Sequence, residues 1–442
     1  MATSVPISAP FPPVPADSGT WMYEFASELY PICRSITGNG VRETLRRIAR
    51  HIPLTIHEVP TGAPAFDWTI PREWNIRNAW IKDPAGDTLV DFATCNLHVV
   101  SYSIPVHARL TAEQLRPHLH TNPDHSDWIP YRTSYYKEDW GFCIAHRDLP
   151  KFAQGEFEVR IESSLEPGSL TYGECFLPGL SDREILISCH VCHPSLCNDN
   201  LSGIGVATRF ASLIASGPRR LSYRFLFIPG TIGSIVWLSR NQDVVERVAH
   251  GLVLTCIGDA GAFTYKRSRR GDAPIDRAMA HVLRQRPEGH RLVDFTPWGY
   301  DERQYCSPGF NLPVGCLMRT EHGCFPEYHT SADNLDFIRP EALQASLEAC
   351  AEACFVLERD RTLLNLSPRC EPQLGKRGLF RPAGGSGISR ENLATLWVLN
   401  LSDGCHSLLD IAGRAGLPFR LLDEAAERLE AAGLVKELSG DR

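Results

Sequence analysis

The sequence of 442 residues lacks any apolar run that approaches the roughly 20 residues a membrane-spanning helix needs. It also lacks a basic start followed by an apolar stretch, so we expect no secretory signal peptide and a cytoplasmic protein. Positive charge is not in surplus. The net charge of −7 argues against nucleic acid or a membrane as a partner. Residues 1–18, rich in Pro and Ser, are expected to form a disordered leader.

A second Cys-x-x-Cys pair is also missing, so the pair Cys189 and Cys192 does not predict a zinc ribbon. The fifteen cysteines are odd in number and lie scattered through apolar segments, as Cys256, Cys316 and Cys354 do. This distribution favours buried free thiols in a reducing compartment over a framework of disulfides.

Strand and helix patterns alternate along residues 173–368, which predicts a three-layer α/β domain. Two helices in residues 19–54 complete this domain. Residues 55–172 carry short β-branched and aromatic runs between Gly, Pro and Asp turns, which predicts an inserted β-rich domain. The expected strands are 184–189, 222–228, 252–257 and 313–318, and the expected helices are 21–32, 41–52, 203–215, 233–249, 275–286 and 340–358.

Residues 388–442 show three short helices and a final apolar run, the pattern of a winged-helix domain, after a Gly- and Pro-rich linker at 375–387. DNA binding is the obvious role for such a domain. Residues 376–442, however, hold nine Lys and Arg against nine Asp and Glu, and the candidate recognition helix 419–432 is mostly acidic. A helix that faces phosphates should be basic, so we favour a contact with protein.

Polar residues gather where one buried strand ends. The apolar run Ile185–Ile187 leads into a loop with His190, His193 and Asp199, and a helix follows from about Ser202, its expected N-cap. Open α/β sheets bind ligands where a strand gives way to a helix. A hydrolytic zinc site needs about three His or carboxylate ligands, so this loop is the predicted metal site.

Two other interpretations apply to the same loop. Residues 189–193 read Cys-x-x-Cys-His, the attachment motif of c-type haem. We disfavour haem because the motif continues a buried strand in a chain without a secretory signal. The other alternative is an ordinary polar loop without a ligand. We favour a metal site over it because two His and one Asp lie within ten residues.

Further polar residues follow the other expected strands. His329 is the expected third metal ligand, and Asp259 is a fourth ligand or a carboxylate that orients an imidazole. The remaining candidates, all after expected strands of the same domain, are Asp301, Glu302, Arg303, Arg319, Glu321, His322, Glu327 and Tyr328.

Seven long motifs span nearly the whole chain after the leader: LYPICRSITGNGVRETL, VPTGAPAFDWTIPREW, NLHVVSYSIPV, IPYRTSYYKEDWGFC, ISCHVCHPSLCNDNLSG, YDERQYCSPGFNLPVGCLMR and EYHTSADNLDFI. With them the chain resembles a bacterial family of aminopeptidase-like proteins, a domain of unknown function with a β-rich insertion and a C-terminal winged helix. This family is similar to the zinc aminopeptidase superfamily. The resemblance implies a phosphorylase/hydrolase-like catalytic domain and a metal on His193, Asp199 and His329, with His190 as the alternative to His193.

The chain departs from the superfamily at one important place. After the strand that ends at Ile228, the resemblance leads us to expect a glutamate as general base, but Gly230 stands there. Thr231 replaces the glutamate that would bind a second metal, so we expect one zinc per chain. Loss of a general base costs about two to four orders of magnitude in rate. Glu302, Glu321 and Glu327 are the candidate replacements.

We therefore expect a metal-dependent, aminopeptidase-like hydrolase that acts on an amide or acyl bond of a small amino-acid-like or peptide substrate. The resemblance suggests a biosynthetic pathway. The candidate roles are carboxylate binding by Arg303 or Arg319, with Asp301 also in the substrate site, and oxyanion stabilisation by Tyr328 or His322. The alternative is an inactive binding protein, because Gly230 removes the base. A homo-oligomer would use the β-rich or the winged-helix domain.

Overall fold

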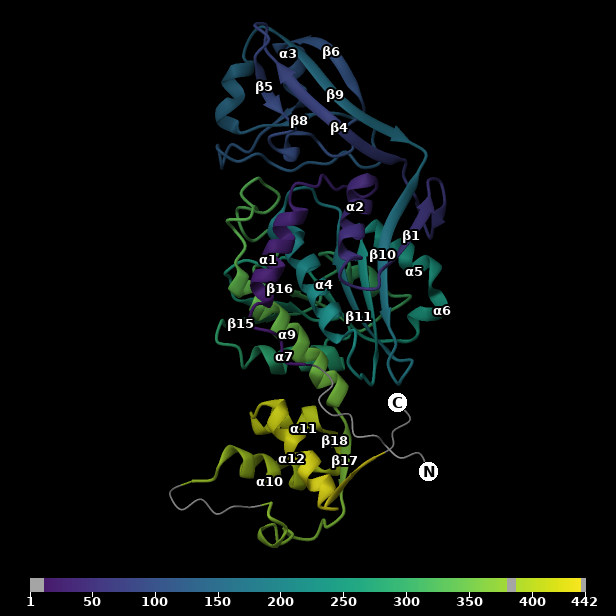
Figure 1. Cartoon of the computed structure of the whole chain (residues 1–442), viewed down its shortest axis with the longest axis vertical. Coiled ribbons are helices and arrows are strands. Elements are labelled where there is room, and N and C mark those ends of the chain that lie inside the picture. The colour runs from purple at the N-terminus through teal and green to yellow at the C-terminus, as the bar shows by residue number, and fades with distance from the viewer. Residues whose placement is uncertain (1–11, 380–386, 439–442) are drawn as a thin grey trace. The chain divides into compact units, whose positions relative to one another are not determined.

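The computed structural model describes residues 12–379 and 387–438 (Figure 1). The chain divides into two compact units, residues 1–273 with 291–348, and residues 274–290 with 349–442. Most of the predicted leader, residues 1–11, lies outside the described residues, as do residues 380–386 of the predicted linker. The described part of the leader is held, since the carbonyl of Pro15 accepts hydrogen bonds from Ser18 (3.1 Å) and Gln344 (3.2 Å).

The first unit is built on an eight-stranded mixed sheet. In spatial order its strands are β1 (Thr55–Pro60), β10 (Ser169–Leu177), β12 (Ser222–Ile228), β11 (Glu184–His190), β13 (Val248–Leu254), β16 (Val314–Met318), β14 (Phe263–Lys266) and β15 (His290–Val293). The four central strands, β12, β11, β13 and β16, are parallel. Because all four read as apolar runs, the sequence predicted each of them.

Helices cover both faces of this sheet. Phe210 of α4 (Ser202–Ile214) packs against Tyr223 and Phe225 of β12, with ring centroids 6.1 and 5.9 Å away. Trp237 of α5 (Ile232–Arg240) shares a core cluster with Leu226 of the same strand. Alternate residues of a strand point to opposite faces, so α4 and α5 lie on opposite sides of the sheet. The predicted three-layer architecture is confirmed.

Two local predictions are wrong. The expected helix 233–249 ends at Arg240, because a second short helix follows and the backbone from Val248 onward pairs with β11. Ser202 is not an N-cap, since its hydroxyl donates to the carbonyl of Asn198 (2.6 Å) from inside the helix. The other helices of this unit are α1 (Ser18–Leu29), α2 (Asn39–Ile48), α6 (Gln242–Val245), α8 (Glu302–Tyr305) and α9 (Pro340–Arg359), which continues past residue 348.

The inserted domain has its own four-stranded antiparallel sheet and apolar core. Its strands are, in order, β5 (Thr88–Asp91), β4 (Glu73–Lys82), β9 (Glu156–Glu166) and β6 (Val106–Thr111). Smaller elements are β2 (Pro64–Ala65), β3 (Trp68–Thr69), β7 (Leu119–His120), β8 (Phe142–Cys143), α3 (Ala112–Leu115), η1 (Asn96–His98), η2 (Arg116–His118) and η3 (His146–Phe152). The predicted range 55–172 is too wide, because β1 and the start of β10 pair within the central sheet.

The second unit contains a three-stranded sheet and a helical cluster. Its elements are α7 (Pro274–Leu283), β17 (Thr362–Asn365), η5 (Gly375–Arg377), α10 (Arg390–Leu401), β18 (Asp403–Ser407), α11 (Leu408–Ala415), α12 (Phe419–Ala431) and β19 (Val435–Glu437). The sheet starts at β17, well before residue 388, where the sequence predicted the domain to begin.

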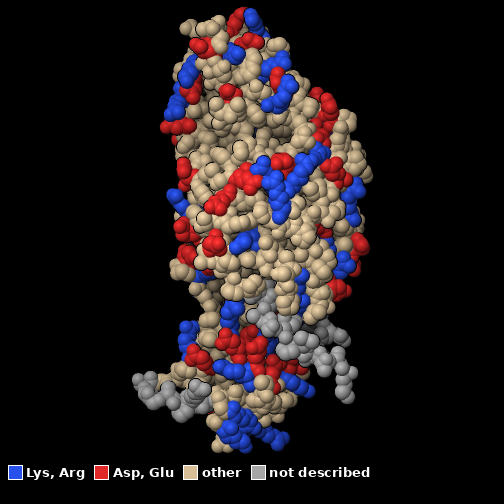
Figure 2. Space-filling model, viewed as in Figure 1, with Lys and Arg blue, Asp and Glu red and all other residues tan. Residues whose placement is uncertain are grey.

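Acidic residues of α12 are already paired within this unit. Asp423 accepts hydrogen bonds from Arg359 (2.8 Å) and Arg361 (2.6 Å), and Glu430 pairs with Arg361 (3.1 Å). On the face that Figure 2 shows, basic and acidic side chains are intermixed over the first unit, whereas in the second unit the acidic side chains gather in one area and a group of basic ones lies at the end of the domain. The ion pairs are consistent with the equal numbers of basic and acidic residues in this part of the sequence. The preference for a protein contact over DNA stays a prediction.

No helix in residues 12–379 and 387–438 combines the length and the apolarity that crossing a membrane requires. All fifteen cysteines are free, and most of them are buried.

Candidate metal centre

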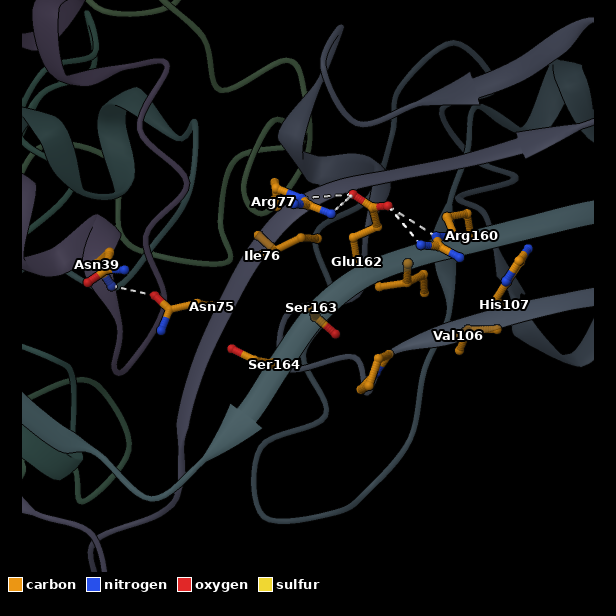
Figure 3. A pocket seen from close by; sticks show the side chains of 12 residues that line it. Asn39, Asn75, Ile76, Arg77, Val106, His107, Arg160, Glu162, Ser163 and Ser164 are labelled. Carbon is orange, nitrogen blue, oxygen red and sulfur yellow. Dashed lines mark hydrogen bonds and ion pairs between the residues drawn. The ribbon is translucent and has the colours of Figure 1, made fainter.

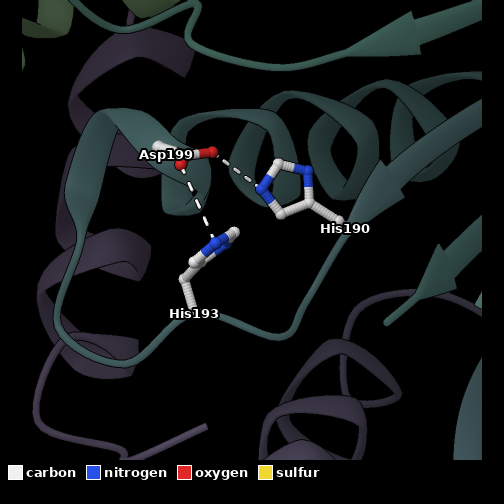
Figure 4. A group of neighbouring side chains, drawn as sticks. All are labelled: His190, His193 and Asp199. Atoms are coloured by element: carbon white, nitrogen blue, oxygen red, sulfur yellow. Dashed lines mark hydrogen bonds and ion pairs between the residues drawn. The ribbon is translucent and has the colours of Figure 1, made fainter. Parts of the chain in front are cut away.

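The loop after β11 and the irregular turn η4 (Cys197–Leu201) bring three predicted ligands together (Figure 4). His190 Nε2 lies 2.8 Å from one oxygen of Asp199, and His193 Nε2 lies 3.9 Å from the other. All three side chains are buried, and their potential ligand atoms lie within 4.8 Å of one another. The peptide bond between Asp199 and Asn200 is cis.

The fourth member of the cluster comes from a distant loop. His329 Nε2 lies 3.0 Å from Asp199 Oδ2, and its ring lies 5.1 Å from that of His193. The backbone of His329 has a positive φ of 55°, an uncommon conformation for a residue with a side chain. Tyr328 stacks on the His329 ring at 4.0 Å, so this predicted catalytic residue does lie beside the cluster.

A network of buried carboxylates holds the turn that carries Asp199. Asp333 accepts hydrogen bonds from the backbone N–H groups of Asn198 (2.6 Å) and Asp199 (3.0 Å). The Asn198 side chain in turn donates to Asp259 (2.9 Å), which also accepts from the Thr320 hydroxyl (2.8 Å). The predictions for Asp259 are therefore wrong. Its oxygens are used by amide and hydroxyl donors, so it supports the ligand turn instead of binding metal or an imidazole.

The charge states in this cluster suit a metal. Burial lowers the pKa of His190 and holds that of His193 well below its usual value, although the Asp199 carboxylate opposes both shifts. Burial alone would raise the pKa of Asp199, but the neighbouring imidazoles outweigh it and hold that pKa well below its usual range. Neutral imidazole and ionised carboxylate are the forms that bind metal ions.

Two residues near the cluster were not predicted, and one of them is Tyr131 of the inserted domain. Its ring lies 5.3 Å from that of His193 and 5.2 Å from that of His329. Its backbone N–H donates to the carbonyl of His329 (2.7 Å), and Pro130 forms a β-bridge with Thr330. The inserted domain therefore covers part of the metal centre.

The second is Tyr300, which fills the space expected for the general base. A Cβ atom on Gly230 would lie 2.1 Å from Cε1 and 2.7 Å from the hydroxyl of Tyr300. The Tyr300 ring lies 3.9 Å from that of His190, and its hydroxyl lies 3.5 Å from Cys192 Sγ. A phenol therefore stands where a carboxylate would stand in a chain with glutamate at position 230.

Glu302 is engaged in an ion pair and is not free to act on a substrate, which corrects the prediction for this residue. The buried Glu302 carboxylate pairs with Lys266 Nζ (2.8 Å) and accepts the backbone N–H of Tyr300 (3.1 Å). Glu302 therefore positions Tyr300 and is not a base. Asp301 is also fully buried, and its Oδ1 accepts from the Ser234 hydroxyl (2.7 Å), while burial raises its pKa to about 7. Its Oδ2 has no hydrogen-bond partner among the described residues, so its role in the substrate site stays a prediction.

Arg319 is likewise structural, contrary to the prediction. It is buried, donates to the carbonyl of Gly261 (2.8 Å) and lies over the ring of Phe263. His322 is turned to the sulfur of Met318 (3.3 Å), and Glu321 pairs with Arg291 (2.6 Å).

Two candidates keep groups that could still meet a ligand. Arg303 has a buried Nε without a hydrogen-bond partner among the described residues. Glu327 lines a cavity of about 400 Å³ together with Trp128 and Ser331. Their roles stay predictions.

Arg34 is a further buried residue that sequence reasoning missed. Its Nε donates to the carbonyl of His193 (2.7 Å) and its Nη1 to the carbonyl of Leu29 (2.7 Å). This side chain ties the ligand loop to the N-terminal helices across 159 residues of sequence, a separation at which no local pattern gives a signal.

Family comparisons agree with this arrangement. The family described as a domain of unknown function, DUF4910, matches residues 23–360. The chain belongs to the DUF4910 family. A winged helix-turn-helix family matches residues 361–437, which confirms the C-terminal domain.

A relative of this DUF4910 chain in Clostridium acetobutylicum is 50% identical over 422 residues, which cover 95% of this chain and 97% of the relative. Its name assigns that relative to polysaccharide biosynthesis and gives it an aminopeptidase-like domain. A crystal structure from the same organism, named as a peptidase, is 49% identical with a TM-score of 0.91, covering 96% and 98% of the two chains.

More distant structures share the fold alone. A zinc aminopeptidase from Bacillus subtilis has 14% identity and a TM-score of 0.57, and the match covers 78% of this chain and 96% of that one. A peptidase M28 precursor from Shewanella amazonensis has 13% identity and a TM-score of 0.56, with 77% and 94% covered. The predicted zinc-aminopeptidase fold is confirmed.

The contact between residue 230 and Tyr300 makes a testable prediction. Replacing Gly230 with Ala should lower the free energy of unfolding by about 1–3 kcal/mol, because the added methyl group overlaps the Tyr300 ring. In the double variant Gly230→Ala, Tyr300→Ala the overlap is absent. Adding Gly230→Ala to Tyr300→Ala should therefore lower the free energy of unfolding much less than Gly230→Ala does alone. Chemical denaturation of both single variants and the double variant measures the coupling.

Gly309→Ala is the matched control, because a methyl group there meets no atom within 4 Å. It should change stability little. Strictly additive effects at positions 230 and 300 would show that the two residues do not compete for one space.

Proposed function

We propose that this protein is a metal-dependent hydrolase that cleaves an amide or acyl bond of a small amino-acid-like substrate, with one zinc ion per chain. The observation that supports it is the buried cluster of three imidazoles around the Asp199 carboxylate. Imidazole nitrogen and carboxylate oxygen are the ligands of catalytic zinc sites, so the donor set fits this metal.

Hydrogen bonds around Asn200 support a role for His190 other than that of a metal ligand, although His190 lies within reach of His193 and Asp199. Asn200 Nδ2 donates to the carbonyl of Leu254 (3.0 Å) and its Oδ1 accepts from Gly203 (3.2 Å), which fixes the orientation of the amide. The NH₂ group therefore faces His190 Nδ1 at 3.4 Å. A donor at Nδ1 leaves the His190 proton on Nε2, from where it donates to Asp199 (2.8 Å).

We therefore assign the zinc to His193, Asp199 and His329. His190 would orient the carboxylate of Asp199, the kind of support that metal ligands generally have. When bound, the ion would polarise a substrate carbonyl as a Lewis acid.

The proton chemistry would fall to Tyr300. Burial raises its pKa well above the usual value, so it is a neutral phenol that donates hydrogen bonds and does not accept a proton. Among the described residues, no carboxylate except Asp199 bonds to the imidazole cluster. A centre with a donor and without a carboxylate base suits stabilisation of a developing oxyanion, and it would be slow on ordinary peptides.

A biosynthetic step fits these properties better than general proteolysis. The Tyr131 contacts restrict the space beside the cluster, which favours a small substrate. The name of the Clostridium relative also points to biosynthesis. The fifteen free thiols suit a reducing compartment such as the cytoplasm. For the winged-helix domain we propose a contact with protein, including a second copy of this chain, and not with DNA.

Zinc content tests the ligand assignment. Protein purified without added metal should carry about one zinc per chain by elemental mass spectrometry. His193→Ala and His329→Ala should each lose it, whereas His190→Gln should keep it with an affinity reduced roughly 10- to 100-fold. His125→Ala, an imidazole stacked on Trp128 outside the cluster, is the control and should keep its zinc. Full zinc content in both ligand variants would refute the assignment.

Tyr300→Phe tests the catalytic part of the proposal. With a panel of amino-acid p-nitroanilides and N-acyl amino acids, kcat should fall roughly 100-fold or more, because a hydrogen-bond donor at the reacting oxygen is lost. Zinc content and thermal stability should stay unchanged, since the ring remains in place. Equal kcat values for the unmodified protein and Tyr300→Phe, on a substrate that the unmodified protein turns over, would show that the Tyr300 hydroxyl takes no part in the reaction.

The position of Tyr300 also favours a second candidate function, that of a binding protein without catalysis. In that case the ring would simply fill the space of a lost base. Such a protein would bind zinc as above but would turn over no member of the panel, and Tyr300→Phe would alter neither ligand binding nor stability.

A further inference from the structure

A second cavity, of about 650 Å³, lies in the first unit at the inserted sheet and next to the start of α2 (Figure 3). It is lined by Asn39, Asn75, Ile76, Arg77, Pro105, Val106, His107, Arg160, Ile161, Glu162, Ser163 and Ser164. None of these residues belongs to the metal cluster. The volume lies within the usual range for small-molecule sites.

The charged lining residues leave a positive excess. Arg77 Nε donates to one oxygen of Glu162 (3.0 Å) and Arg160 Nε donates to the other (3.1 Å), as Figure 3 shows. Two guanidinium groups thus share one carboxylate, which leaves a net charge of one positive on these three side chains. His107 adds none, since it lies 3.8 Å from the carboxylate of Glu158. Glu162 holds both groups at the cavity, and an anion would neutralise the remaining charge.

Several hydrogen-bond donors at this cavity are also unused. In the part of the chain that the structure describes, no residue bonds to Nη1 of Arg77, to Nη1 of Arg160, to the Ser164 hydroxyl or to the side-chain NH₂ of Asn39. A guanidinium binds carboxylate or phosphate oxygens through paired N–H groups. The hydroxyl and amide groups add donors and acceptors of the kind that bind hydroxyl groups.

The rest of the lining is aliphatic. Only part of it is open to a ligand: Pro105 is exposed, Ile76 and Val106 are half-buried against the core of the inserted domain, and Ile161 lies within that core. Carbon-bound hydrogens of a ligand can pack on such a surface while its polar groups meet the charged residues. A purely inorganic anion would leave this part of the cavity unused.

We propose that this cavity is a binding site for a small polyhydroxylated anion, that is, a sugar acid or a sugar phosphate. Arg77 and Arg160 bind the acidic group, and Ser164, Asn39 and Asn75 bind hydroxyl groups. This site shares no residue with the metal centre. The proposal therefore does not depend on whether that centre is catalytic.

Isothermal titration calorimetry on the full chain tests this site with glucuronate, glucose 1-phosphate and neutral glucose. One or both anions should bind, and which of them binds more tightly separates a carboxylate from a phosphate ligand. Glucose should bind at least tenfold more weakly than the better anion, because it lacks the charge-assisted hydrogen bonds. Arg160→Gln and the more exposed Arg77→Gln should each weaken anion binding about tenfold or more.

Arg109→Gln is the matched control, because this exposed residue lies on β6 two positions from His107 but outside the cavity. It should leave anion affinity unchanged, as should the metal-site variant His193→Ala. Absence of saturable binding of both anions at about 10 mM, equal affinity for glucose, or equal losses in Arg109→Gln and Arg160→Gln would each overturn the proposal.

Discussion

The buried carboxylate of Asp199 is the constraint on which the rest of the site depends. An ionised group removed from water costs several kcal/mol unless hydrogen bonds or a metal compensate it. Here three imidazoles compensate it, and they come from the end of β11, the loop behind it and a loop 130 residues away. The turn itself is held by the Asp333 carboxylate, and the loop before it is held by the Arg34 side chain. The need to satisfy one carboxylate thus explains why distant segments meet at this edge of the sheet.

Much of this centre could be predicted from the sequence, because parallel strands end at one edge of a sheet. That rule placed polar residues near His193, Asp199 and His329 together without any contact data. The rule failed for Asp259, which also follows a strand. A position near the edge of the sheet does not tell whether a carboxylate faces a ligand or accepts hydrogen bonds from the surrounding protein. The fold class followed from the strand and helix alternation for a similar reason, whereas boundaries such as that of β13 depended on pairing partners.

The residues that sequence reasoning missed come from segments with no periodic pattern. Tyr131 reaches the centre through a β-bridge between the inserted domain and the His329 loop, which no propensity predicts. The absence of a glutamate at Gly230 was visible in the sequence, but its replacement was not. Tyr300 fills that space only because Glu302, paired with Lys266, holds its backbone. Glu302 was expected to be a candidate base, but in the structure its carboxylate positions the Tyr300 phenol.

Charge is used differently in the three parts of the chain. In the first unit the buried Asp199 carboxylate is surrounded by imidazoles, and in the inserted domain the Glu162 carboxylate binds two guanidinium groups at an open cavity. In the winged-helix domain Asp423 of α12 is paired with Arg359 and Arg361.

Anomalous diffraction at the zinc absorption edge, on crystals of the protein as purified, tests the central claim most directly. The account predicts one peak per chain, bonded to His193, Asp199 and His329, with Tyr300 still in the space beside Gly230. Two peaks about 3.5–4 Å apart, the spacing of two-metal hydrolases, would contradict it, and so would a single peak bonded to His190 in place of His193.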